Sequence, residues 1–84
     1  MQEKKQKILN SLSKIVRKNR GDISITQLAL SVDVSKSIWY MIEQGKRDAQ
    51  LTTIFKIAEA FNLKPSKLLQ ELESDLGESF SLSE

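Results

Sequence analysis

Apolar residues recur along this chain at the spacing of amphipathic helices. The first stripe lies within residues 3–20 and repeats at every third or fourth position, which is the period of one face of an α-helix. Its members are Ile8, Leu12, Ile15 and Val16, with Leu9 beside them. Gly21 follows, and because glycine commonly stands just past a helix end, the pattern predicts a first helix over residues 3–20.

Two short helices are predicted next. The order Ser-Ile-Thr-Gln at 24–27 matches a capping box, in which the serine hydroxyl and the glutamine side chain each bond an amide that the helix leaves unpaired. A turn over residues 32–34 leads to a second short helix, which begins after Ser35, runs to about Gln44 and ends at Gly45. Helices this short are not stable alone, so they are expected to pack in a bundle.

Two further helices complete the predicted fold. One spans about 51–61 and precedes Asn62, and the next has Pro65 in its first turn, where the missing N–H of proline costs no hydrogen bond. Their apolar members are Leu51, Ile54, Ile57, Ala58 and Phe61, followed by Leu68, Leu69, Leu72 and Leu76. No segment alternates as strands do. The sequence therefore predicts one all-α domain over 1–77, a compact five-helix bundle, with a short, mobile, acidic tail over 78–84.

The segment 24–45 carries the main functional signal, because a short helix, a tight turn and a second short helix form the helix-turn-helix arrangement. On a helical wheel the helix after Ser35 has two sides. The core side holds Ile38, Trp39 and Ile42, and the outward side holds Lys36, Ser37, Tyr40, Met41 and Gln44. The outward groups can donate to base acceptors or touch a thymine methyl. Acidic residues are nearly absent from this side, which favours a helix that contacts DNA over an ordinary helix that faces solvent.

Charge is distributed unevenly along the chain. Its net charge is only +2, yet residues 1–69 hold all 13 basic residues and six acids, whereas residues 70–84 hold five acids and no base. A basic body with an acidic tail suggests that the body contacts a polyanion. Lysine-rich surfaces also keep small domains soluble, so charge alone leaves both interpretations open.

The residue types present make several functions improbable. The chain has no Cys and no His, so disulfides, thiolate zinc sites and the usual nucleophile–base pairs are missing. No apolar run approaches the roughly 20 residues that span a bilayer, and the charged start is not a signal peptide. We therefore expect a cytoplasmic protein that is not an enzyme and has no cofactor, no metal and no membrane contact. The short length also leaves no room for a ligand-sensing domain, so no small-molecule effector is expected.

Taken together, these features resemble the lambda-repressor/Cro-like (XRE-type) helix-turn-helix family. The resemblance covers roughly residues 8–69. It is carried in register by Leu28-Ala29, Val34-Ser35, Trp39, Ile42-Glu43-Gln44-Gly45-Lys46-Arg47, Leu51, Thr53-Ile54, Lys56-Ile57-Ala58, Ala60, Pro65 and Leu68-Leu69. It implies a lambda-repressor-like bundle that places its third helix in the major groove of double-stranded DNA, and hence a sequence-specific transcriptional regulator.

The resemblance also implies roles for individual residues. The base-reading positions are Lys36, Ser37 and Met41, with Tyr40 adjacent. The phosphate-contacting positions are Ser24, at the start of the second helix, and Gln44, Lys46 and Arg47. Arg17 and Glu43 fall on positions that pair as a structural salt bridge.

Four places depart from the family's pattern. The turn at Gly21-Asp22 is one residue longer than usual. Ile25 stands where a glutamine usually follows the cap of the second helix, so one amide contact is missing. Asp33 replaces the customary glycine of the turn, and aspartate tolerates a left-handed conformation better than most residues. Residues 48–50 lack the usual Pro-Ser, which leaves the fourth helix a weak cap.

A homodimer is expected, because proteins of this class usually bind two half-sites about one helical turn of DNA apart. The apolar stripe extends to Leu72 and Leu76; it either covers its own core or forms a two-fold interface, and we expect the interface. The predicted function is therefore a homodimeric regulator on a palindromic operator. One alternative is an antitoxin-type protein that autoregulates its operon and binds a protein partner. Another is a degenerate helix-turn-helix used only for protein contacts.

Overall fold

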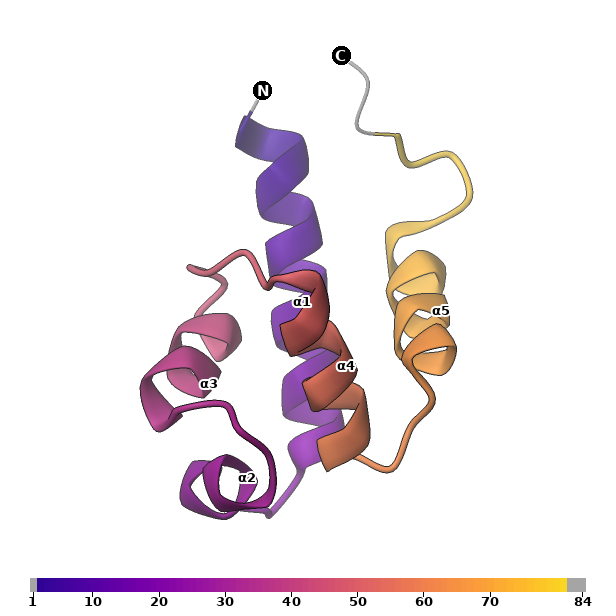
Figure 1. The fold of residues 1–84 in the computed structure, drawn as a ribbon. Helices are drawn as coiled ribbons and strands as arrows, with labels where there is room; N and C mark the ends of the chain where they lie inside the picture. The colour runs from indigo at the N-terminus through magenta and orange to yellow at the C-terminus, as the bar shows by residue number, and fades with distance from the viewer. Residues whose placement is uncertain (1, 82–84) are drawn as a thin grey trace.

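The computed structural model describes residues 2–81, and within them the chain forms five α-helices and no strand. The helices are α1 (Gln2–Arg20), α2 (Ile25–Ser31), α3 (Lys36–Glu43), α4 (Leu51–Ala60) and α5 (Pro65–Leu76), as Figure 1 shows. The all-α prediction is confirmed, and each predicted helix is present. No helix among the described residues is long and apolar enough to cross a membrane. Residues 82–84, the end of the predicted mobile tail, lie outside the described residues.

The predicted caps define the helix-turn-helix. The Ser24 hydroxyl accepts a hydrogen bond from the Gln27 amide at 3.0 Å, and the Gln27 side chain accepts one from the Ser24 amide at 3.1 Å. The capping box is therefore confirmed. Ser35 caps α3 by accepting from the Ile38 amide at 3.3 Å. The cap of α4, Gln50, makes no side-chain bond to the helix, in agreement with the weak cap expected there.

Gly45 lets the end of α3 approach α1 closely. The residue is buried and has a φ of +69°, which L side chains rarely adopt. A Cβ here would lie 2.8 Å from Oδ1 of Asn10 on α1. Gln6, one turn earlier on α1, donates to the Gly45 carbonyl at 2.8 Å. Glycine therefore ends α3 where both the backbone conformation and the space require it.

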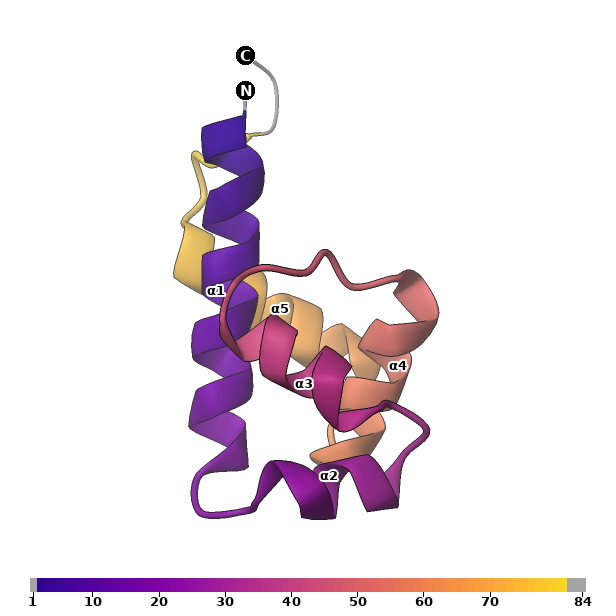
Figure 2. The same ribbon diagram turned by 90° about the vertical axis from the view of Figure 1, so that its left-hand side faces the viewer.

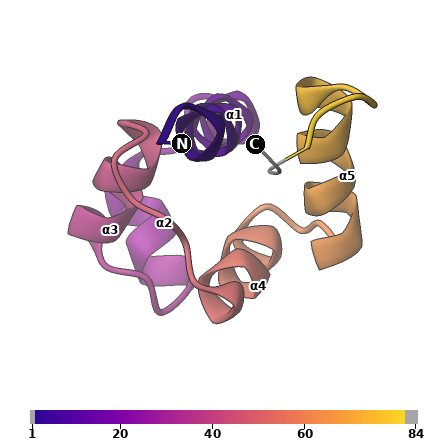
Figure 3. The same ribbon diagram turned by 90° about the horizontal axis from the view of Figure 1, so that it is seen from above.

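The helices surround one core. α1 packs against α3 and α5, α2 against α3, and α4 against α5. Viewed from above, α3 and α5 lie on opposite sides of the bundle and α4 lies across from α1 (Figure 3). The largest fully buried side chains are Trp39, Ile42, Ile57, Leu68 and Val16. The Trp39 ring meets the Phe61 ring edge to face, with centroids 5.9 Å apart, so the predicted inward orientation of Trp39 is confirmed.

Leu72 belongs to this core as well, which corrects the expectation that it lines a dimer interface. It is 8% exposed and is part of the same apolar cluster as Leu68. The reason is its position one helical turn after Leu68, which turns it toward the same side of α5. Leu76, one turn further on, is partly buried and lines a shallow hollow with Phe80, next to α1.

Asp75 fastens the end of α5 to α1. Its carboxylate accepts from the Lys14 ammonium at 2.8 Å and from the Ser11 hydroxyl at 2.6 Å. These bonds favour the charged carboxylate and lower the pKa of Asp75 below its ordinary value, the bond from Lys14 having the larger effect. Polar contacts thus join α5 to α1 in addition to the packing between the two helices.

Candidate nucleic-acid interface

α3 turns one side to the core and the other to solvent, as predicted. Trp39 and Ile42 are buried, whereas Tyr40 is 58% exposed. The other outward residues, Lys36, Ser37 and Gln44, are exposed, and Met41 is partly buried at the edge. The polar side chains among them make no hydrogen bond or ion pair with the rest of the described chain. Their donors and acceptors are therefore available to a ligand. We call these five outward residues the α3 surface.

The turn between α2 and α3 sets how the two helices pack. Leu28 anchors α2 in the core, and its carbonyl accepts from the Val32 amide at 3.2 Å. The Val34 amide donates to the Val32 carbonyl at 2.8 Å, and the Val34 side chain is buried. Asp33 does not adopt a positive φ, which among the described non-glycine residues occurs at Asn62 alone. This turn therefore needs no glycine, so the departure at Asp33 leaves the fold intact.

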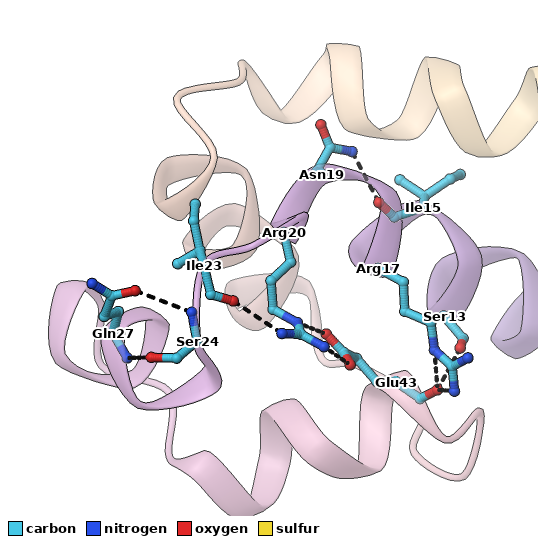
Figure 4. A network of polar contacts seen from close by, with 9 residues as sticks. All are labelled: Ser13, Ile15, Arg17, Asn19, Arg20, Ile23, Ser24, Gln27 and Glu43. Atoms are coloured by element: carbon cyan, nitrogen blue, oxygen red, sulfur yellow. Dashed lines mark hydrogen bonds and ion pairs between the residues drawn. The ribbon is translucent and has the colours of Figure 1, made fainter.

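Glu43, at the end of α3, ties that helix to α1 (Figure 4). Its carboxylate, which is 8% exposed, accepts two hydrogen bonds from the Arg20 guanidinium, one of them 2.8 Å long. Its carbonyl accepts from the Ser13 hydroxyl at 2.6 Å and from Arg17 at 2.6 and 3.1 Å. The hydrogen-bonded Glu43 carboxylate raises the pKa of Arg20 further above its ordinary value, although burial opposes the shift.

The predicted salt bridge between Arg17 and Glu43 is therefore wrong in its partner. Arg20 forms the ion pair, and Arg17 contacts the Glu43 carbonyl instead. Arg17 lies almost one helical turn earlier on α1, beside the last turn of α3, where the carbonyls are unpaired. Arg20 also donates to the Ile23 carbonyl at 2.9 Å. One side chain thus joins α3, the end of α1 and the connection to α2.

The acidic side chains near α3 are paired with basic side chains from other parts of the chain. Residues 32–50 contain three acidic and three basic side chains. Each acid has a basic partner from outside the segment: Arg20 for Glu43, Lys56 for Asp33 at 3.7 Å, and Lys5 for Asp48 at 3.8 Å. The exposed pairs contribute little to stability, but they offset the charge of the acids they contact.

The three basic side chains of the same segment remain unpaired. Lys36, Lys46 and Arg47 are exposed and make no side-chain hydrogen bond or ion pair within the described residues. Lys36 starts α3, and the other two follow its end. Figure 2 shows α3 and the loop after it on the side that faces the viewer. This side therefore carries an excess of positive charge that the composition of the segment does not reveal.

The remaining phosphate candidates lie around the α3 surface. Gln44 is exposed at the C-cap of α3, beside the loop that carries Lys46 and Arg47. Ser24 is exposed at the N-cap of α2, where its hydroxyl is engaged in the capping box. The structure thus places the candidates on α3 and at its ends, with Ser24 at the start of the helix packed against it. Their contacts with DNA stay predictions.

The arrangement defines a helix-turn-helix domain, and comparison with known proteins agrees. A helix-turn-helix family model matches residues 14–68, well over half of the chain. The chain therefore belongs to the helix-turn-helix family of DNA-binding regulators, in the XRE-type branch expected from the sequence. It is similar to the control protein C.MunI from a Mycoplasma species, with 30% identity over 66 residues that cover 79% of this chain and 88% of the relative. Comparison with solved structures gave no significant match.

Proposed function

We propose that this protein is a transcriptional regulator that reads a palindromic DNA operator as a homodimer, with α3 in the major groove. The observation that carries the proposal is the α3 surface. Its polar side chains have no partner within the described chain, and the acids of the surrounding segment are each offset by a base from elsewhere. A surface of this kind suits the phosphates and base edges of a duplex. The relative's name, a control protein, supports a regulatory role.

Lys36, Ser37, Tyr40 and Met41 are the proposed base-reading residues. In helix-turn-helix proteins the N-terminal residues of the second helix contact base edges. Lys36 and Ser37 are the first two residues of α3, and the other two lie one turn later. A lysine ammonium can donate to the O6 and N7 acceptors of guanine, and a hydroxyl can serve either as donor or acceptor. The partly buried Met41 offers an apolar edge that suits a thymine methyl.

Lys46, Arg47, Gln44 and Ser24 are the proposed phosphate contacts. Cations that neutralise phosphates supply most of the affinity that does not depend on sequence, and contacts to the backbone fix the register of the reading helix. Lys46 and Arg47 extend in a loop directly after α3. The Arg20–Glu43 pair fixes the other side of α3 to the bundle, so both groups of residues would meet DNA in a constant relative position.

Selection of bound duplexes from a random-sequence pool tests this proposal. We expect enrichment of a two-fold symmetric site whose half-sites lie about one helical turn apart. On the enriched site, log affinity should fall linearly with log salt concentration, by roughly 0.9 for each phosphate contacted. Absence of enrichment together with a flat salt response would contradict DNA reading. Enrichment of a single asymmetric site would contradict the palindrome.

A further inference from the structure

We propose that Gln6, in the first turns of α1, is a positioning residue for DNA binding. It fixes the direction of the loop after α3, and through that loop the positions of Lys46 and Arg47. We call residues 45–48 the exit loop of α3. The inference rests on the proposed function, because it names the residue that holds two of the proposed phosphate contacts in place. Gln6 lies before residues 14–68, the region that the family model matches.

The peptide unit between Gly45 and Lys46 is held at both of its polar groups. Its carbonyl, that of Gly45, accepts a hydrogen bond from the Gln6 side chain at 2.8 Å. Its N–H, that of Lys46, donates to the Met41 carbonyl at 3.0 Å. One bond comes from α1 and the other from α3. Because a peptide unit is planar, the two bonds together fix the direction in which the chain leaves α3.

α3 alone holds only one side of this peptide. The Gly45 amide donates to the Ile42 carbonyl at 3.0 Å, and with the bond from Lys46 to Met41 this forms the pair of bonds that ends many helices before a glycine. Both bonds use carbonyls of α3, so the Gly45 carbonyl is left for a partner outside that helix. Among the described residues, 47–49 take part in no backbone–backbone hydrogen bond. The Gly45–Lys46 peptide is therefore the last fixed point before Arg47.

The Gln6 side chain is itself held in place. Its amide nitrogen carries two hydrogens, and both are used. One bond goes to the Gly45 carbonyl, and the other goes to Oδ1 of Asn10 at 2.9 Å. Asn10 lies one turn later on the same side of α1. The donor that meets the exit loop is therefore already oriented by α1.

A second contact joins α1 to the exit loop beyond the two cations. The Lys5 ammonium lies 3.8 Å from the Asp48 carboxylate. Lys5 and Gln6 are consecutive, so neighbouring residues of α1 contact the loop on either side of residues 46–47 (Figure 2). The exposed ion pair contributes little by itself. The Gln6 bond is therefore the contact on which the position of the loop depends most.

A loop that is fixed before DNA arrives favours binding. Lys46 and Arg47 are exposed, and ordering such side chains and their loop during binding costs conformational freedom. The bond from Gln6 places the start of the loop in advance and so reduces that cost. Contacts to phosphates carry no sequence information. We therefore expect Gln6 to affect the affinity for all duplexes alike.

Fluorescence anisotropy of a labelled random-sequence duplex at low salt, titrated with the full chain, measures this effect. Gln6→Met keeps the length of the side chain and its lack of charge but removes the donor. We expect it to weaken binding by at least about three-fold. The matched control is Asn19→Leu, because Asn19 of α1 donates an amide bond to Glu71 of α5 at 3.2 Å. This control should leave the affinity unchanged, and circular dichroism reports whether each variant is folded.

A double-mutant cycle separates positioning from a general loss of stability. If Gln6 acts through the two cations, Gln6→Met should weaken binding by less than about two-fold when Lys46 and Arg47 are both alanine. A general loss of stability would weaken binding by the same factor in both backgrounds. The cycle therefore reports the coupling of Gln6 to the exit loop and not its contribution to folding.

Amide hydrogen exchange, followed by NMR without DNA, tests the bond itself. The Lys46 amide is protected by its bond to Met41 only while the peptide keeps its orientation. We expect Gln6→Met to speed exchange at Lys46 relative to exchange at Trp39, whose amide bonds the Ser35 carbonyl at the start of α3. Such a local change shows that the exit loop opens more often while the helix stays formed.

The outcomes separate this inference from the proposed function. Weaker binding in Gln6→Met but not in Asn19→Leu, with the loss abolished when both cations are absent, supports the positioning role. Unchanged binding in Gln6→Met, a loss that persists without the cations, an equal loss in Asn19→Leu, or unchanged exchange at Lys46 overturns it. Wild-type binding in those cases leaves DNA recognition standing. A wild type that binds neither the random-sequence duplex nor any selected duplex would refute the proposed function and this role together.

Discussion

Removing the Glu43 side chain is expected to cost about 2–3 kcal/mol of unfolding free energy. Breaking a buried ion pair by removing one partner typically costs about 3–5 kcal/mol, because the other charge is left buried. In Glu43→Ala the charge left behind is Arg20, whose side chain keeps 26% of its surface in solvent. Water can therefore hydrate it in part, so we expect a cost below that range. Arg20→Ala leaves the more buried Glu43 carboxylate unpaired, so its cost should be larger, about 3–5 kcal/mol.

Arg17→Ala should cost much less than either change. Arg17 bonds the Glu43 carbonyl, which keeps its bond from Ser13 when Arg17 is truncated. No buried group is left unpaired, so the loss is that of ordinary hydrogen bonds, about 0.5–1.5 kcal/mol. The Glu43→Ala variant also retains this backbone carbonyl, so the losses of unfolding free energy from the Arg17 and Glu43 substitutions should be nearly additive.

Urea unfolding followed by circular dichroism measures all of these values. Two double-mutant cycles then separate the pairs. The cycle of Arg20 with Glu43 should show a coupling free energy of at least about 1 kcal/mol, and the cycle of Arg17 with Glu43 should show a coupling close to zero. A larger coupling for Arg17 than for Arg20 would refute the assignment of the ion pair.

Three further predictions follow from single side chains. Trp39→Ala should lower the free energy of unfolding by about 3–5 kcal/mol. Trp39→Phe should lower it by less than half as much, because the buried Trp39 Nε1 has no hydrogen bond for the substitution to remove. Equal losses for the two variants in urea unfolding would contradict this. The pKa of Asp75 is lowered in the folded state, so its stabilisation is present above the ordinary pKa of aspartate and is lost as pH falls through the lowered value. The stability difference between wild type and Asp75→Asn should therefore shrink in acid, and a difference that grows would reverse the sign. On an enriched duplex, Lys36→Ala should cost about 1–3 kcal/mol of binding free energy and relax the preference at one base pair per half-site. Arg47→Ala should weaken binding to all sequences alike and reduce the slope of log affinity against log salt by roughly one per half-site. Titrations on enriched and scrambled duplexes that show these two effects exchanged would contradict the assigned roles.

Local signals were sufficient to predict the helices. Ser24 and Ser35 precede apolar-periodic segments, and the structure confirms that each caps the helix that follows. Gly45 ends α3 with a left-handed backbone. Such signals act within a few residues, so one sequence contains all the information they need. The inward direction of Trp39 could be predicted for the same reason, because the helical period alone fixes it relative to Lys36.

Contacts between helices could not be predicted in the same way. Arg17 and Arg20 are three residues apart, so both lie on neighbouring parts of α1. Which of them meets the Glu43 carboxylate depends on how α3 crosses α1, and that crossing is set by the whole core. The role of Leu72 was ambiguous for a similar reason. An apolar stripe on a helix shows that one side is covered, but it does not show whether the same chain or a second copy covers it.

The positive charge around α3 could not be predicted, because the residues that form the ion pairs are far apart along the chain. Asp33 and Lys56 are 23 residues apart, and Asp48 lies still further from Lys5. Residues 32–50 contain as many acidic as basic side chains, so the composition of this segment gives no sign of a basic surface. Folding brings bases from α1 and α4 to its acids and leaves its own three bases unpaired. No local pattern could have found this arrangement.

The departure at Ile25 shows why association of two copies matters for this chain. The side chain is partly buried and packs against the core, so α2 gains an apolar anchor where its relatives by family have an amide that can face DNA. The side chains of Ser24 and Gln27 are both engaged in the capping box, so the start of α2 offers few free side-chain groups to a phosphate. Recognition by one copy then depends on α3 and the loop that carries Lys46 and Arg47. Because that footprint is small, we expect most of the operator affinity to come from placing two such surfaces on one duplex.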